Sequence, residues 1–220
     1  MPAMVSCLVA LLLRAAEPQM EPNASAPAAA LAQGPEMEVS NALDGWRSGV
    51  ALGWQGMTFW SHESHRYEFQ SLALSYIGSK GHVGPLIHLS ALLPLQAGED
   101  GHVVATSSVY QDRWGADLLL GRQWRWQAGK DFEAEAGPGI HSTLLVLPGR
   151  YGYRDFSALL LGLGGATVLR FRPGARIVGE PLRIGTFAAV AFDFYDPLRS
   201  NDLRAGLTFR AGLYAGFGGR

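Results

Sequence analysis

An all-β fold, an eight-stranded antiparallel up-and-down transmembrane β-barrel, is the fold class that this sequence predicts, and three observations predict it. The mean hydropathy of the 220 residues is +0.06, which is high for a soluble domain. No run nevertheless supplies the ~18 uncharged apolar residues that a membrane-spanning helix needs. Apolar residues instead alternate with small or polar ones, as in strands with one apolar face, and glycine is abundant at 28 residues.

The strand prediction rests on eight segments with a period of two from Trp46 onward. In the last of them Leu207, Phe209 and Leu213 lie on one face, whereas Thr208 and Arg210 lie on the other. Most segments reach the ~9–11 residues that a tilted strand needs to cross a bilayer. The segments are 46–61, 66–78, 83–95, 115–128, 131–147, 156–171, 181–195 and 203–218.

The connections between these segments alternate between tight turns and longer loops, as in a meander barrel. Tight turns are predicted near Gly78–Gly81 and Gly129–Lys130, and the longest loop near Gln96–Trp114. Within that loop, Val103–Tyr110 is able to extend the third and fourth segments as a hairpin. An even strand count places both ends of the barrel on one side of the membrane.

The N-terminal region is predicted to lie outside the barrel. Residues 4–13 are apolar and suit the central region of an export signal, and Ala30-Leu31-Ala32 offers a cleavage site. We therefore expect a signal or leader segment over 1–32, a linker over 33–45 and the barrel over 46–220, with a disordered tail as the alternative for the leader. Cys7 is the only cysteine, so no disulfide, thiol or zinc-cluster chemistry is expected in the mature chain.

The charge balance excludes some function classes. The chain has 18 Lys+Arg against 19 Asp+Glu, a net charge of −1, and only 17% charged residues. A strongly basic nucleic-acid binder and a highly charged disordered chain are therefore disfavoured. No nucleic-acid partner is expected.

In this pattern the chain resembles the eight-stranded bacterial outer-membrane β-barrels, the OmpA-, OmpX- and OmpW-like group. The resemblance covers about 46–218 and rests on the alternating segments. Such proteins usually end in a strand with a C-terminal aromatic that the barrel-insertion machinery recognises, whereas here the alternation ends at Phe217, before Arg220. The resemblance implies a location in the bacterial outer membrane, with outer-membrane lipid and the insertion machinery as partners.

The outer face of such a barrel contacts lipid and carries aromatic residues near the strand ends. The alternative for these aromatics is the core of a soluble barrel. Arg122 shares this face with Leu120, and the faces of the second segment are ambiguous, because Leu72 competes with Phe69 and Ala73. The candidate girdle residues are Trp60, Trp124, Trp126, Phe192, Phe194 and Phe217.

The inner face collects nearly balanced charges, which predicts internal ion pairs because an isolated buried charge costs several kcal/mol. Arg125 shares this face with Glu133 or Glu135 if an odd number of residues closes the hairpin between them. The pairs are interpreted as a gate or as a structural plug. The predicted lumen charge network is Asp117, Arg125, Glu133, Glu135, Arg170, Arg183, Asp193, Arg204 and Arg210.

No catalytic function and no cofactor are expected from the motifs. Nucleotide-binding, zinc-protease and hydrolase signatures do not occur, and His141 and Ser142, being adjacent in a strand, point to opposite faces. His88 and His141 face inward, where hydrogen bonding is a simpler role than metal binding. His62 and His65 around Glu63 are a weak metal-binding pattern, so no metal site is assigned.

The leading functional hypothesis is a non-enzymatic outer-membrane barrel, structural, interacting or porin-like, that meets an extracellular partner through its loops. Tyr110, Trp114, Tyr151 and Tyr153 are the aromatics suited to such contacts. Two alternatives are an OmpW-like conduit for small or hydrophobic molecules and a soluble lipocalin-like barrel. The last would carry its apolar residues inside.

Overall fold

The computed structural model describes residues 45–150, 154–177, 179–199 and 203–218. The predicted leader over 1–32, the linker up to residue 44, and the loop residues Tyr151 and Tyr153 lie outside the described residues. Within the described part, no helix combines the length and the apolar character that a helical membrane crossing requires.

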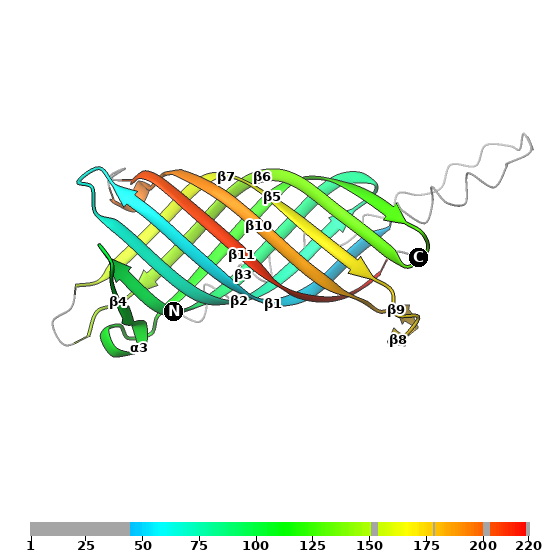
Figure 1. The fold of residues 1–220 in the computed structure, drawn as a ribbon, viewed down its shortest axis with the longest axis horizontal. Coiled ribbons are helices and arrows are strands. Elements are labelled where there is room, and N and C mark those ends of the chain that lie inside the picture. The colour runs from blue at the N-terminus through cyan, green and yellow to red at the C-terminus, as the bar shows by residue number, and fades with distance from the viewer. Residues whose placement is uncertain (1–44, 151–153, 178, 200–202, 219–220) are drawn as a thin grey trace, which may run out of the picture. The chain divides into compact units, whose positions relative to one another are not determined.

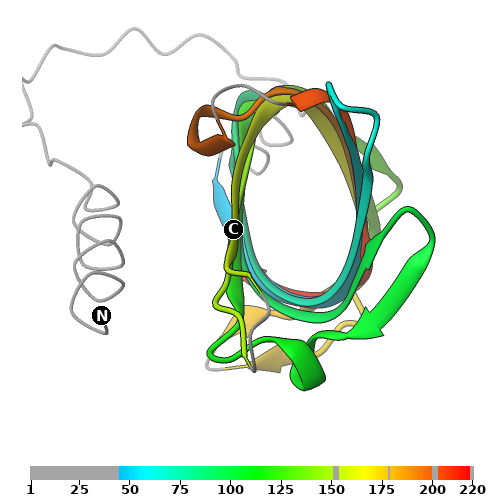
Figure 2. The same cartoon turned by 90° about the vertical axis from the view of Figure 1, so that its left-hand side faces the viewer.

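Eight long strands form a closed antiparallel barrel (Figure 1). Each pairs with the next long strand along the chain, and β1 pairs with β11, which completes the oval ring seen end-on in Figure 2. The shortest has 13 residues and the longest 17, which confirms that the strands are long. They are β1 (Trp46–Ser61), β2 (Arg66–Lys80), β3 (Val83–Glu99), β5 (Trp114–Ala128), β6 (Phe132–Leu147), β7 (Phe156–Phe171), β10 (Arg183–Tyr195) and β11 (Leu203–Gly218).

Short elements lie in the connections at the two ends of the barrel. The end with connections 62–65, 100–113, 148–155 and 196–202 is called the loop end, and the end with connections 81–82, 129–131 and 172–182 the turn end. The loop end carries β4 (His102–Ala105), α3 (Thr106–Val109) and the 3-10 helix η1 (Pro197–Arg199), and the turn end carries β8 (Arg176–Ile177) and β9 (Glu180–Pro181).

The predicted hairpin in the longest loop is only partly present. β4 folds back on the end of β3, where Glu99 pairs with His102, and the chain then forms one helical turn, α3, instead of a second strand. Asp100 and Gly101 make the turn with φ of 50° and 88°. A two-residue hairpin turn of this kind needs positive φ at both positions, which Asp-Gly supplies.

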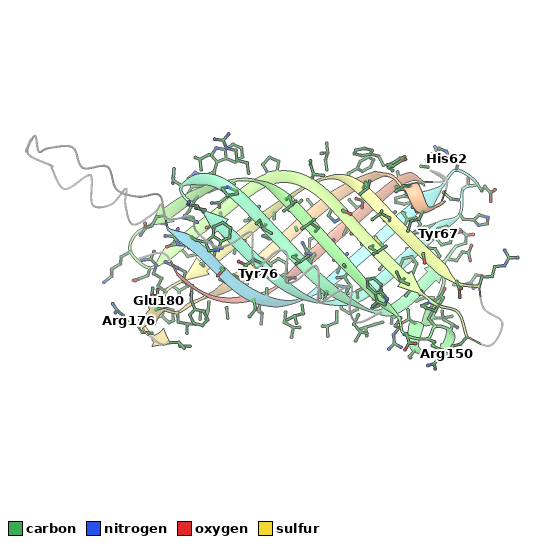
Figure 3. All side chains as sticks on the ribbon, turned by 180° about the vertical axis from the view of Figure 1, so that it is seen from behind. His62, Tyr67, Tyr76, Arg150, Arg176 and Glu180 are labelled. Atoms are coloured by element: carbon green, nitrogen blue, oxygen red, sulfur yellow. The ribbon has the colours of Figure 1, made fainter. Side chains whose placement is uncertain are left out.

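The two faces of the strands are sorted as the alternation predicts, and the ambiguity of β2 is resolved. Leu72, Leu74 and Tyr76 lie on the outside, whereas Phe69 and Ala73 are buried inside. Figure 3 shows side chains covering the outer wall, with Tyr76 among them. The apolar face is therefore the exterior of the barrel and the mixed polar face is its lumen.

One prediction about these faces is wrong, because Arg204 is exposed rather than in the lumen. The register between β1 and β11 shifts at this point: Trp60 pairs with Ala205, but Ser61 pairs with Leu203, so Arg204 has no partner position on β1. A bulge of one residue reverses the facing of everything beyond it. Leu203 is buried as a result, in the place that alternation gives to Arg204.

Candidate functional site

The lumen is the candidate site, because the described part of the barrel gathers its buried charges there. Its side chains form three groups along the axis. Apolar and aromatic residues lie towards the loop end, a cluster around His141 lies near the middle of β6, and an arginine-rich cluster lies towards the turn end.

Aromatic rings close the lumen towards the loop end. Phe59, Phe69, Tyr67 and Phe156 contact one another with ring centroids 5.0–6.1 Å apart. Stacked and tilted rings at such distances attract one another beyond the effect of burial alone. The loop end of the lumen is therefore filled with apolar side chains rather than open to solvent.

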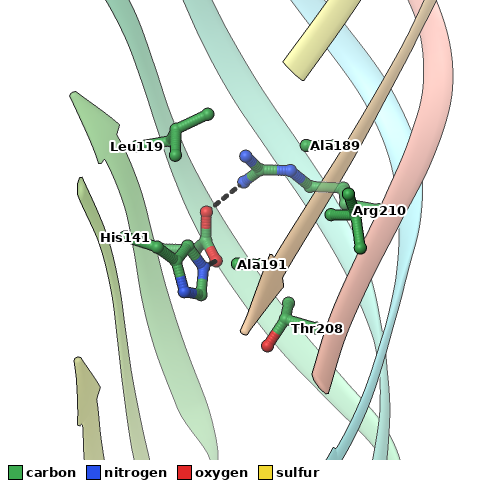
Figure 4. Close-up of a pocket in the computed structure, with 8 residues that line it drawn as sticks. Leu119, His141, Ala189, Ala191, Thr208 and Arg210 are labelled. Carbon is green, nitrogen blue, oxygen red and sulfur yellow. Dashed lines mark hydrogen bonds and ion pairs between the residues drawn. The ribbon is translucent and has the colours of Figure 1, made fainter. Parts of the chain in front are cut away.

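A second group, the aspartate–histidine cluster, consists of Asp117, His141, Asp193 and Arg210. His141 Nδ1 lies 2.6 Å from Asp193 Oδ1, and its Nε2 lies 2.8 Å from Asp117 Oδ2. An ionised carboxylate only accepts hydrogen bonds, so both ring nitrogens donate and His141 is an imidazolium. Arg210 also donates to Asp117, as a dashed line marks in Figure 4. The cluster therefore holds two positive and two negative charges.

Two further observations bear on what this cluster does. Both nitrogens of His141 are engaged by carboxylates, so the predicted hydrogen-bonding role describes it better than metal binding. The cavity beside Arg210 and Thr208 has a volume of about 10 Å³. That is room for no more than one water molecule.

His88 is buried in the lumen as expected, but the hydrogen bonds expected for it do not form within the described residues. Neither ring nitrogen has a partner there. The ring instead meets the edge of Phe187, with centroids 6.1 Å apart. His88 thus makes a packing contact with Phe187.

The third group, the arginine cluster, consists of Arg47, Arg125, Arg170, Arg172 and Arg183 around Glu133 and Glu135. Arg125 Nε lies 2.6 Å and Arg170 Nη1 2.5 Å from Glu135 Oε1, and Ser79 donates to Oε2 of the same carboxylate at 2.9 Å. Glu133 lies 3.4 Å from Arg47, 3.7 Å from Arg183, and accepts a hydrogen bond from Arg172. Every carboxylate of the cluster therefore serves at least two guanidinium groups.

The hairpin register explains why Arg125 meets Glu135 rather than Glu133. Gly129, Lys130 and Asp131 close the hairpin, so that Ala128 pairs with Phe132 and Arg125 stands directly opposite Glu135. This is the odd-numbered closure that the shared face requires.

The predicted lumen charge network is wrong in some of its members. Arg204 leaves the lumen, but Arg47 at the start of β1 and Arg172 just after β7 join it, and sequence alternation had assigned neither of them. The buried side chains include five arginines and five carboxylates, and Arg172 joins them with 27% of its side chain exposed: Arg47, Arg125, Arg170, Arg183 and Arg210 with Asp117, Glu133, Glu135, Asp193 and Asp196.

The substitution Arg125→Ala is expected to lower the stability of the barrel by about 1–3 kcal/mol, the cost of unpairing a buried charged acceptor. The loss stays moderate because Arg170 and Ser79 continue to hold Glu135. Urea unfolding in detergent, followed by tryptophan fluorescence, measures it. A stability equal to that of the wild type would show that the Arg125–Glu135 pair makes no net contribution.

The aromatic residues predicted as girdles all lie exposed on the outer wall. Trp124, Trp126 and Phe217 are near the turn end, and Trp60, Phe192 and Phe194 are near the loop end. Arg122 is also on the outside, opposite Pro85 of β3.

The loop aromatics differ from one another. Trp114 is exposed at the first residue of β5. Tyr110, in contrast, is half-buried and packs against the aromatic group at the loop end, and it bridges to Gly149. Packing of this kind suits Tyr110 to holding loops together more than to meeting a partner.

A contact between His65 and Asp100 joins the first two connections at the loop end. His65 Nδ1 lies 2.8 Å from Asp100 Oδ2, and the Arg66 amide donates to Oδ1 at 2.8 Å. Glu99 contributes a carboxylate oxygen, and the atoms of His65, Glu99 and Asp100 that could bind a metal ion lie within 4.8 Å of one another. All three side chains are exposed and Asp100 is already hydrogen-bonded, so we interpret the group as a loop clamp.

The loop clamp predicts a pH dependence. The hydrogen bond and charge of Asp100 raise the pKa of His65 above 6.5, and the Arg66 amide followed by His65 lowers the pKa of Asp100 below 3.8. The clamp is therefore complete between these ordinary values, weakens as pH rises through the raised pKa of His65, and weakens as pH falls through the lowered pKa of Asp100. NMR titration of His65 in micelles measures the first transition. Asp100→Asn should move it back towards 6.5, whereas Asp112→Asn should leave it in place.

Comparisons with known proteins add little beyond the fold. No protein-family model matches the chain, and no curated protein sequence matches it. Among solved structures, the chain is similar to the crystal structure of Neisserial surface protein A, with a TM-score of 0.46 and 11% sequence identity over 80% of this chain and 96% of that chain. No residue role is transferred from this similarity.

Proposed function

We propose that this chain is an integral β-barrel protein of the bacterial outer membrane that anchors its loops at the cell surface. One observation carries the proposal: the large apolar side chains point outward while arginine, aspartate and glutamate side chains are buried inside. A soluble barrel has the opposite arrangement, because water favours charges outside. In a bilayer the closed ring satisfies every backbone group and the apolar wall meets hydrocarbon.

The proposal includes export through a signal within 1–32, folding by the barrel-insertion machinery, and contacts of the loop end with an extracellular partner. The arrangement of faces also argues against the soluble lipocalin-like alternative, which needs an apolar interior. Heat-modifiable migration on a gel tests the membrane barrel: a closed barrel resists cold detergent and migrates anomalously until heated. Unchanged migration, with the protein in the soluble fraction, would overturn the proposal.

The substitution Leu163→Arg tests which solvent the outer wall meets. Leu163 is 61% exposed at the centre of β7. A charge at the bilayer midplane costs ~2–4 kcal/mol, whereas it costs ~0–1 kcal/mol near the interface. Folding into lipid vesicles should therefore be destabilised strongly by Leu163→Arg and weakly by Ser157→Arg near the strand end. Equal, small effects of the two variants would indicate water on the outside.

The filled lumen favours an anchor over the porin-like or OmpW-like conduit. Aromatic rings occupy the loop end of the lumen, and the cavity beside Arg210 has a volume of only about 10 Å³. Planar-bilayer recordings should accordingly show no discrete channel events from the full chain. Regular unitary currents would instead support the conduit.

A further inference from the structure

We propose that the loop clamp at the loop end of the barrel binds a divalent transition-metal cation of the zinc class. Its ligands are His65, Glu99 and Asp100, which lie in or next to the connections 62–65 and 100–113. The fold brings Asp100 to His65 from 35 residues away, so no local pattern in the sequence contains this set of ligands. The site goes beyond the anchor role and does not rest on it.

The three side chains lie close enough to share one ion. His65 Nδ1 is 2.8 Å from Asp100 Oδ2 and 3.8 Å from Glu99 Oε1, and each side chain offers a ligand atom within 4.8 Å of the others. Zinc binds nitrogen and carboxylate oxygen at ~2.0–2.2 Å, so two ligand atoms on one ion are about 3–4 Å apart. The side chains of His65, Glu99 and Asp100 are 45%, 57% and 48% exposed. Small rotations therefore bring them to that spacing without disturbing the packed lumen.

The kinds of donor atom select the cation. One imidazole nitrogen and two carboxylate oxygens are ligands of zinc and of similar transition metals, whereas Ca²⁺ and Mg²⁺ take oxygen ligands. A dication also neutralises the two carboxylates of Glu99 and Asp100. In the loop clamp His65 Nδ1 donates its proton to a hydrogen bond with Asp100 Oδ2, and a cation takes the place of that proton. The hydrogen-bonded clamp and the metal site are thus two states of the same side chains.

Backbone hydrogen bonds hold two of the ligands in position independently of a cation. The Arg66 amide donates to Asp100 Oδ1 at 2.8 Å, and Asp100 Oδ2 is the oxygen next to His65. The Asp100 amide donates to the Arg66 carbonyl, and the Ser61 amide donates to the His65 carbonyl, each at 2.9 Å. The guanidinium of Arg66 pairs with Glu68. A hydrogen bond to the second oxygen of a carboxylate ligand orients that ligand and strengthens metal binding.

Calorimetric titration of the full chain, refolded in detergent, with zinc chloride at constant pH and ionic strength tests the site. We expect saturable binding of Zn²⁺ that His65→Gln and Asp100→Asn each weaken at least tenfold. Asparagine tolerates the φ of 50° at position 100, so the second variant keeps the turn. The matched control is His82→Gln, at an exposed position of the turn end, which should leave the affinity unchanged. Titration with calcium chloride should show no saturable binding.

Two further variants keep the test decisive. Glu99→Gln should also weaken binding at least tenfold, and it replaces Asp100→Asn if that variant fails to form the closed barrel, which heat-modifiable migration reports without zinc. Cys7→Ser removes the only thiol of the chain and should leave the affinity unchanged. NMR gives an independent readout, since Zn²⁺ should shift the Nδ1 resonance of His65 and leave that of His82 in place.

Three results would overturn the site. The first is the absence of saturable Zn²⁺ binding by the wild type. The second is equal Zn²⁺ affinity in the wild type and in the folded His65→Gln and Asp100→Asn barrels, or loss of binding in Cys7→Ser or His82→Gln. The third is Ca²⁺ binding as tight as that of Zn²⁺, which the imidazole ligand does not allow.

Discussion

The substitution Glu135→Ala is expected to destabilise the barrel by about 3–5 kcal/mol, the loss typical of breaking a buried ion pair from one side. Glu135 accepts from Arg125, Arg170 and Ser79, and all four side chains are buried. Its removal leaves Glu133 as the only acidic member of the arginine cluster. The loss should exceed that of Arg125→Ala, because a guanidinium has substitutes here and a carboxylate does not.

Urea unfolding in detergent measures this difference. Glu68→Ala is the matched control, since Glu68 pairs with Arg66 at the exposed start of β2, where such pairs contribute ~0–1 kcal/mol. If Glu135→Ala and Glu68→Ala lose the same small amount, the arginine cluster does not depend on its carboxylates for stability.

The substitution His141→Ala is expected to cost a similar ~3–5 kcal/mol, for the opposite electrostatic reason. It removes the cation between Asp117 and Asp193 and leaves two buried carboxylates with Arg210 alone. Thr143 and Thr208 continue to donate to them, but neutral hydroxyls do not supply the missing charge.

A double substitution tests this explanation. The pair His141→Ala/Asp193→Ala restores the charge balance, so it should be less destabilised than the sum of the two single variants. His102→Ala, at an exposed loop position, is the control and should be close to the wild type. Strict additivity in the double variant would mean that His141 contributes packing and not charge.

The strands and their faces were predictable because each is a local property of the chain. The alternation of apolar and polar residues gave the eight strands, and the predicted register condition places Arg125 opposite Glu135. Arg204 was assigned to the wrong face because a bulge adds one residue to a strand without interrupting its alternation. Arg172 escaped prediction because it lies beyond the end of β7 and returns to the lumen.

Contacts across the lumen were not predictable from alternation. His141 meets Asp193, 52 residues away, and Arg210 meets Asp117, 93 residues away. Strand neighbours follow from the meander order, but partners across the ring depend on strand tilt, side-chain length and the oval cross-section in Figure 2. These partners were therefore visible only in three dimensions.

The pairing of β1 with β11 has a consequence for the time course of folding. Arg47 stands opposite Gly218, so the ring closes only when the two ends of the barrel sequence meet. Contacts between residues so distant in sequence slow folding, since the chain must lose most of its freedom before they form. Until then β1 and β11 are open edges that pair readily with other chains. Pairing of β1 with β11 thus ends the period in which this protein is most prone to aggregate.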